Sequence, residues 1–96
     1  MRDIVIKPIC KDTQWYTGDK ERDDSFLKYQ MNYANELLKH RGFLFLNDVY
    51  DMLGYARTKT GQFLGWRAGD EVKINRNGEY LEIEVSGDIL NVLADE

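Results

Sequence analysis

The pair Asn77-Gly78 constrains the fold more than any other feature, because it stands between two segments of alternating apolar and polar residues. Asn-Gly is the preferred centre of a two-residue β-hairpin turn, and side chains that recur with a period of two line one face of a strand. Residues 71–76 and 80–86 are therefore predicted to be two adjoining antiparallel strands.

A turn centred on Asn77-Gly78 also predicts the register of this hairpin. The apolar pairs are Ile74 with Leu81 and Val72 with Ile83, and the opposite-charge pairs are Lys73 with Glu82 and Arg76 with Glu79. Each charge pair contributes only about 0.2–1 kcal/mol. A slip of one residue would turn every apolar side chain outward, so the alternation constrains the register more firmly than the charges do.

Residues 25–40 carry the strongest helical pattern. Apolar side chains recur there at three- and four-residue spacing. The stripe consists of Phe26, Leu27, Met31, Tyr33, Ala34, Leu37 and Leu38. Asp24 or Ser25 can cap the first turn, and the basic residues 39–41 lie at the negative end of the helix dipole before Gly42. These signals together predict one long amphipathic helix.

The segments before and after this helix have shorter patterns. Residues 2–9 alternate in a way that suits a short strand with Pro8 near its end, and residues 11–24 are polar and are interpreted as a loop. Residues 43–46 form either a buried extended segment or the entry to the next element. Asn47 offers a cap to a short helix that ends at Gly54 and buries Val49, Met52 and Leu53.

The predicted architecture is a single α+β domain over residues 1–96. It has an antiparallel sheet of three to five strands, one long amphipathic helix across one face, and one short helix before the sheet. Residues 62–67 supply a further strand, and residues 88–96 form either a last helical turn or an edge strand.

Composition excludes several classes of protein. The longest wholly apolar run, residues 43–46, is far shorter than the roughly 20 residues that cross a bilayer, so we expect a cytoplasmic protein that does not bind membranes. Cys10 is the single cysteine, which excludes an internal disulfide and favours a reducing compartment. His40 is the single histidine, and no cysteine or carboxylate stands beside it at ligand spacing. We therefore expect no catalytic residue, no metal and no cofactor.

The charge is unevenly distributed. Residues 70–96 hold 8 acidic and 2 basic side chains, whereas the formal net charge of the whole chain is −4. Glu79, Glu82 and Glu84 lie in the predicted hairpin, where alternate strand residues are about 7 Å apart. Such a row would attract a basic partner by imitating backbone phosphates, and it disfavours direct binding of nucleic acid.

Trp15 and Tyr16 lie in the polar segment before the long helix, where they are either a lid over the core or exposed anchors for a partner. Trp66 alternates with Leu64 and is predicted to fill the core under the long helix.

The stretch RTKTGQFLGW, residues 57–66, has two interpretations. Arg57 and Lys59, with Arg67 just after the stretch, would form an anion cradle with the amides around Gly61. A phosphate loop of the Walker type, however, needs glycines at set intervals and a helix next, and here a strand is predicted. We favour a polar connection in which Gly61 permits an unusual backbone angle.

Residues 40–66, HRGFLFLNDVYDMLGYARTKTGQFLGW, resemble a family of short uncharacterised proteins from phages and integrated elements of Gram-positive bacteria. The likeness rests on Gly42 with the apolar run after it, on Leu53-Gly54, and on Gly65-Trp66, and it includes the Asn-containing helix before them. It is confined to the central part of the chain and offers no catalytic residue. The resemblance implies a mobile-element setting, in which small proteins often bind and block a host protein, as anti-CRISPR inhibitors do.

The expected function is therefore that of a non-enzymatic binding module that inhibits a host protein. A host protein that itself binds nucleic acid is one candidate for this partner. The contact residues are expected to be Trp15, Tyr16, Glu79, Glu82 and Glu84. The alternative is a structural or assembly protein of a phage particle that acts by forming homo-oligomers. An enzyme that gathers His40 or Cys10 with carboxylates, and direct nucleic-acid binding through Arg57, Lys59 and Arg67, are the weaker hypotheses.

Overall fold

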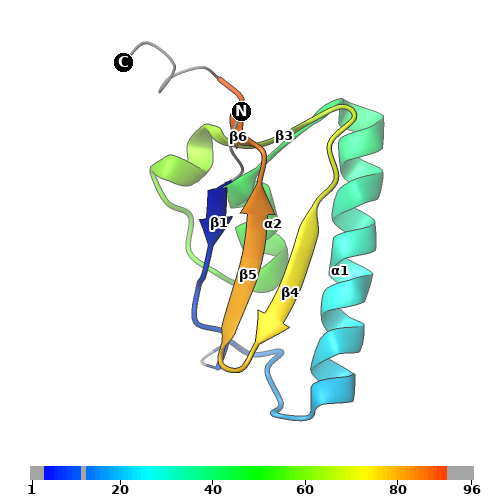
Figure 1. Ribbon diagram of the computed structural model, residues 1–96, viewed down its shortest axis with the longest axis vertical. Helices are drawn as coiled ribbons and strands as arrows, with labels where there is room; N and C mark the ends of the chain where they lie inside the picture. Colours follow the sequence, from blue (N-terminus) through cyan, green and yellow to red (C-terminus); the bar gives the residue numbers. More distant parts are fainter. Residues whose placement is uncertain (1–3, 12, 91–96) are drawn as a thin grey trace.

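The computed structural model describes residues 4–11 and 13–90 and shows an α+β fold, as the sequence predicts (Figure 1). Two helices, one long and one short, accompany two small antiparallel sheets. In chain order the elements are β1 (Ile4–Ile6), α1 (Lys20–Arg41), β2 (Phe43–Phe45), α2 (Leu46–Leu53), the 3-10 turn η1 (Thr60–Gln62), β3 (Leu64–Arg67), β4 (Lys73–Asn77), β5 (Tyr80–Val85) and β6 (Gly87–Asp88).

The strands divide into two three-stranded sheets, with the orders β1-β5-β4 and β2-β3-β6. One continuous sheet does not form because β2 and β6 occupy both edges of β3, which leaves no edge for β4. The connection from β3 to β4 turns at Gly69, whose φ is +97°. The carboxylate of Asp70 fixes this turn by accepting a hydrogen bond from the Arg67 amide at 2.8 Å.

In the β4–β5 hairpin each apolar residue lies on the predicted face, but the two strands pair in a different register. Val72, Ile74, Leu81 and Ile83 are all buried, as predicted. The pairs are Asn77 with Tyr80, Arg76 with Leu81, Asn75 with Glu82, Ile74 with Ile83, and Lys73 with Glu84. The predicted pairs, including Lys73 with Glu82 and Arg76 with Glu79, are therefore wrong by two residues. Gly78, with φ +65°, occupies the first central position of the turn. In one common type of hairpin turn this position is glycine.

Helix α1 begins at Lys20, so the interpretation of residues 20–24 as loop is wrong. Asp19 is the N-cap, and its carboxylate accepts from the amides of Glu21 at 3.0 Å and Arg22 at 3.4 Å. Neither Asp24 nor Ser25 caps the helix. The first turn escapes a search for apolar periodicity because its buried side chain is a carboxylate, Asp23. The helix ends at Gly42, with φ +81°, as predicted.

The stripe on α1 is narrower than predicted. Leu27, Ala34 and Leu38 are buried, and Phe26, Met31 and Leu37 are partly buried, whereas Tyr33 is 51% exposed. The assignment of Tyr33 to the buried stripe is therefore wrong. The buried stripe is narrow because α1 packs against β2 and β4. It runs along the β4 side of the sheet β1-β5-β4 and does not lie across a broad sheet face (Figure 1).

Residues 43–45 form strand β2, so the prediction of an extended segment is the correct one of the two. Helix α2 then begins at Leu46, and Asp48 accepts a hydrogen bond from the Phe45 amide at 3.0 Å. Asn47 is therefore not the N-cap; it lies inside the first turn and is only 6% exposed. The helix ends at Gly54, as predicted, with a φ of +82°.

Strand β1 is shortened by Pro8. The Pro8 carbonyl accepts from the Leu81 amide at 2.9 Å, so residue 8 faces β5, where a proline has no N–H to donate. Pairing resumes as a single bridge between Ile9 and Tyr80. Of the predicted C-terminal element, residues 88–96, only Asp88 lies in a described strand, β6, which pairs with β3, and residues 91–96 lie outside the described part of the chain.

Buried side chains from both sheets and both helices form one cluster. Trp66 lies in it with no exposed surface, as predicted, and its indole N–H donates to the Glu84 carbonyl at 2.9 Å. Cys10 is also fully buried.

Candidate protein-interaction surface

The sheet β1-β5-β4 has one buried face and one open face. Along β5, Leu81, Ile83 and Val85 are buried, and the alternate residues Tyr80, Glu82 and Glu84 project to the other side. That side faces the viewer in Figure 1, and neither α1 nor α2 covers it. We call it the outer sheet face. Its side chains are Val5, Lys7 and Ile9 from the β1 segment, Lys73, Asn75 and Asn77 from β4, and Tyr80, Glu82 and Glu84 from β5.

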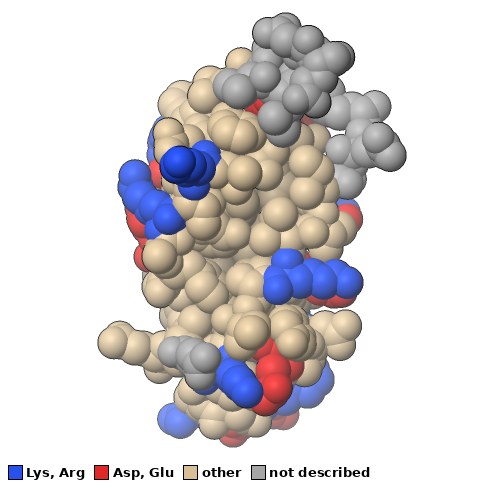
Figure 2. Space-filling model, turned by 90° about the vertical axis from the view of Figure 1, so that its left-hand side faces the viewer, with Lys and Arg blue, Asp and Glu red and all other residues tan. Residues whose placement is uncertain are grey.

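The carboxylates on the outer sheet face have cationic neighbours. Glu84 pairs with Val5 of β1 on one side and with Lys73 of β4 on the other. Glu82 and Lys7 line one shallow hollow of about 380 Å³ together with Asn77 and Tyr80. Basic and acidic side chains are accordingly interspersed on the β1 side of the molecule rather than gathered into one acidic field (Figure 2). The sequence places Glu82, Glu84 and Lys73 on one face correctly but does not reveal Lys7.

Apolar side chains lie on the same face. Val5 is 47% exposed, Ile9 46% and Tyr80 48%, and Ile9 and Tyr80 are bridged partners on neighbouring strands. Sequence reasoning did not select these three residues. The period-two alternation that places Glu82 outward also places Tyr80 outward, so the signal for Tyr80 is present.

Glu79 lies in the turn at the end of this face. Its carboxylate is 3.8 Å from the Lys11 ammonium, and its carbonyl accepts from the Cys10 amide at 2.8 Å. Both side chains of the ion pair are about half exposed, so the attraction between them is worth little in water. Glu79 therefore lies at the rim of the outer sheet face with its carboxylate half exposed.

Trp15 and Tyr16 lie elsewhere, as a lid over the core. The Trp15 ring stacks on Phe26 with a centroid distance of 5.1 Å, and its indole N–H donates to the Leu53 carbonyl at 2.9 Å. Tyr16 packs against the core cluster beneath the guanidinium of Arg76, 5.8 Å from its ring centroid. The structure does not bring this pair together with the glutamates.

The cations proposed for an anion cradle have protein partners in two cases. Arg57 makes a bidentate pair with Asp51, which raises the pKa of the guanidinium and lowers that of the carboxyl. The guanidinium of Arg67 donates to the Ile89 carbonyl at 2.7 Å. Lys59 is exposed, and its ammonium makes no hydrogen bond or ion pair with the described residues. The described contacts do not join the three side chains to one another.

The loop that contains Arg57 and Lys59 is organised by the buried Asn47. Its amide donates to the Thr58 carbonyl at 3.0 Å and accepts from the Thr58 amide at 2.9 Å. A Cβ at Gly61 would lie 2.0 Å from the Asn47 Oδ1. Glycine is needed there for close approach, not for the unusual backbone angle expected from the sequence. This stretch is a connection held by Asn47.

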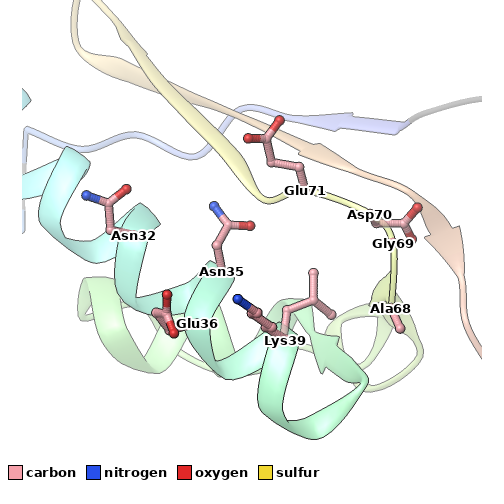
Figure 3. A pocket seen from close by; sticks show the side chains of 9 residues that line it. Asn32, Asn35, Glu36, Lys39, Ala68, Gly69, Asp70 and Glu71 are labelled. Atoms are coloured by element: carbon pink, nitrogen blue, oxygen red, sulfur yellow. The ribbon is translucent and has the colours of Figure 1, made fainter.

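A second hollow, of about 760 Å³, lies between α1 and the connection from β3 to β4 (Figure 3). Asn35 fills its inner wall, since its amide donates to the Val72 carbonyl at 3.1 Å and its oxygen accepts from the Val72 amide at 2.7 Å. Asn35 thereby joins the helix to the chain just before β4. The other polar residues around this hollow are Asn32, Glu36, Lys39, Asp70 and Glu71.

Neither Cys10 nor His40 lines the two hollows described above. Burial raises the pKa of the Cys10 thiol, and a thiol with a raised pKa is a weak nucleophile. His40 lies on the exposed surface of α1 with Glu36 at 3.7 Å. Within residues 4–11 and 13–90, no three histidine, cysteine or carboxylate side chains gather as metal ligands would. No helix in the same residues combines the length and apolar character needed to cross a membrane.

These features define a small α+β protein with an open, mixed-charge sheet face. A family model described as "Family of unknown function (DUF6353)" matches residues 7–95, and the chain therefore belongs to that family. The expectation of a family without an assigned activity is confirmed, and the match extends well beyond the central segment. No curated protein and no solved structure matched the chain.

Proposed function

We propose that the protein is a non-enzymatic binding module that occludes a host protein through the outer sheet face. The observation that carries the proposal is the uncovered face itself, on which Val5, Ile9 and Tyr80 expose apolar surface beside Glu82 and Glu84. Exposed apolar groups with a charged rim are the usual composition of a protein interface, and tyrosine is enriched at its centre.

The resemblance of residues 40–66 to phage and mobile-element proteins supports an inhibitory role in the cytoplasm of a Gram-positive host, of the anti-defence or anti-CRISPR type. Glu79, Glu82 and Glu84 then select a partner with a basic rim, such as a nucleic-acid-binding protein. Lys7 and Lys73 moderate this charge, so apolar contact supplies most of the affinity. Trp15 and Tyr16, which lie in the lid over the core, are not part of this contact.

The test is capture of a partner from host lysate, followed by measurement of its affinity and of its activity during titration. Tyr80→Asp is expected to weaken binding at least tenfold, because it places a charge at the centre of the apolar patch, and inhibition should weaken in parallel. Lys59→Asp, on an exposed loop away from this face, is the control. Equal affinity of Tyr80→Asp and the wild type would reject the outer sheet face as the contact.

The acidic component has its own measurement. Glu82→Gln combined with Glu84→Gln should lower the association rate and flatten its dependence on salt, since exposed charges act chiefly on encounter. An unchanged salt dependence would contradict selection by charge while leaving the apolar contact standing.

A further inference from the structure

Helix α1 exposes two tyrosines that the fold does not use. Tyr29 is 71% exposed and Tyr33 is 51% exposed, and neither belongs to the core cluster or packs against it. They stand four residues apart, so they are neighbours on the helix surface. In Figure 1 no other element of the described residues lies over the flank of α1 that points away from β4.

The residues around Tyr29 have a symmetric spacing. Ser25 and Tyr33 lie four residues before and after it, and Arg22 and Glu36 lie seven residues before and after it; all are exposed. Residues at these intervals form one stripe along a helix, as the contact positions of a coiled coil do. We call this set the α1 outer stripe.

The α1 outer stripe is complementary to itself. If two copies of α1 pack antiparallel about a two-fold axis at Tyr29, the two Tyr29 rings meet and each Tyr33 lies over Ser25 of the other copy. Arg22 of each copy then faces Glu36 of the other, so two opposite-charge pairs form. The same alignment brings the basic last turn near the acidic first turn of the other helix, and opposed helix dipoles favour it.

We propose that α1 is a homodimerisation surface, occupied by the α1 outer stripe of a second copy of this chain. The order of charges along the stripe favours a second copy as the partner. Arg22 and Glu36 lie at equal distances from Tyr29, so each faces the opposite charge of the other copy when the two helices run antiparallel. A helix of this length is about 33 Å long, so the contact is small and the dimer is reversible. The inference is independent of the outer sheet face.

Sedimentation of the purified full chain over a range of concentrations tests the dimer. The wild type should pass from the mass of one chain to the mass of two. Arg22→Glu alone, or Glu36→Arg alone, should weaken association at least tenfold by creating like-charge pairs. An equimolar mixture of these two variants should restore the dimer, because each copy then supplies one half of a complementary pair.

Lys59→Glu is the matched control, since it makes the same charge change on a loop outside α1 and should leave association unaltered. Circular dichroism should show full helix content in Arg22→Glu, because a carboxylate near a helix N-terminus is favourable. A wild type that stays monomeric, or a mixture that does not reassociate, would overturn the proposal. A dimer that survives Tyr29→Ala and Arg22→Glu would use another surface and would overturn it as well.

Discussion

Asp23 is fully buried, and it ties the segment before α1 to the helix. Its carboxylate accepts from the Thr17 amide at 3.0 Å, the Thr17 hydroxyl at 2.8 Å and the Gly18 amide at 3.1 Å. Desolvation by burial raises the pKa of this carboxyl, but the hydrogen bonds and the nearby Arg76 outweigh it, and the net pKa is lowered. Asp23 therefore stabilises the folded state only while it is ionised.

This gives a prediction for the dependence of stability on pH. Because the folded pKa is depressed, the contribution of Asp23 is complete above the unfolded value of about 3.9 and is lost as the pH falls through the folded pKa. Asp23→Asn should cost about 1–3 kcal/mol of unfolding free energy at neutral pH, since its amide cannot accept all three bonds. Urea unfolding at several pH values should also show a smaller loss of stability in acid than in the wild type.

Glu21→Gln is the control for Asp23→Asn, because Glu21 is an exposed carboxylate in the same helical turn. It should keep the acid-induced loss and change stability at neutral pH by less than about 0.5 kcal/mol. If Asp23→Asn loses as much stability in acid as the wild type does, the Asp23 carboxyl is not the cause of that loss.

Gly61 and Asn47 should show strong coupling. Gly61→Ala places a Cβ 2.0 Å from the Asn47 Oδ1 and 2.9 Å from the Thr58 hydroxyl oxygen, so Asn47 must leave its hydrogen bonds. We expect a loss of about 2–4 kcal/mol in unfolding free energy. In an Asn47→Ala background the main obstacle is gone, and the same substitution should cost clearly less. Additive losses in the double-mutant cycle would contradict this contact.

At the turn of the β4–β5 hairpin, the adjacent residues Asn77 and Gly78 have different backbone requirements. Gly78 holds a φ of +65°, which an alanine adopts at a cost of about 1–2 kcal/mol. Asn77 is a strand residue paired with Tyr80, and a β-branched side chain suits that position. Gly78→Ala should therefore destabilise the protein, and Asn77→Thr should lie within about 0.5 kcal/mol of the wild type in chemical denaturation. A large loss in Asn77→Thr would instead place Asn77 inside the turn.

The same hairpin shows what local pattern determines. Alternation predicts which face each residue occupies, and the buried Val72 and Ile83 agree with it. A shift of two residues preserves every face, so alternation cannot exclude it, and the turn decides the register. Apolar spacing does not reveal the start of α1 for a related reason, because that turn is held by the hydrogen bonds and burial of Asp23.

The candidate surface was predictable to the extent that it is local. Glu82 projects outward because its neighbours on β5 project inward, and the sequence pattern shows this. Lys7 reaches the same hollow from the opposite end of the chain, and no local pattern carries that proximity. Trp15 was undecided for the same reason, since the Leu53 carbonyl that holds it comes from a distant helix.

For the molecule as a whole, the β1 side of the sheet is an exposed edge. Backbone groups of residues 8 and 10 bond to β5, so those of Val5, Lys7 and Ile9 point away from it. Lys7 places a charge there, Pro8 interrupts the strand, and the Tyr55 hydroxyl donates to the Ile9 carbonyl at 2.9 Å. Short strands, lysine and proline protect sheet edges from pairing with other molecules.

Removal of this protection should cause aggregation. Lys7→Val combined with Pro8→Val creates a continuous apolar edge from residue 4 to residue 9, and we expect light scattering to rise at concentrations where the wild type stays clear. Lys73→Val makes the same charge change on β4, whose edge α1 flanks, and should remain clear. Equal scattering from both variants would assign the effect to lost charge rather than to the edge.

The pairing of Ile4 with Val85 and of Ile6 with Ile83 has a consequence for how the chain acquires its structure. During synthesis on the ribosome, α1, β2 and α2 can contact one another soon after they emerge, because they are consecutive in the chain. The β1 segment has to wait until nearly the whole sequence has been translated, because β5 is its one strand neighbour among the described residues. Closure of this sheet is therefore a late event, and a nascent chain that stalls before residue 83 leaves Ile4 and Ile6 without their binding strand.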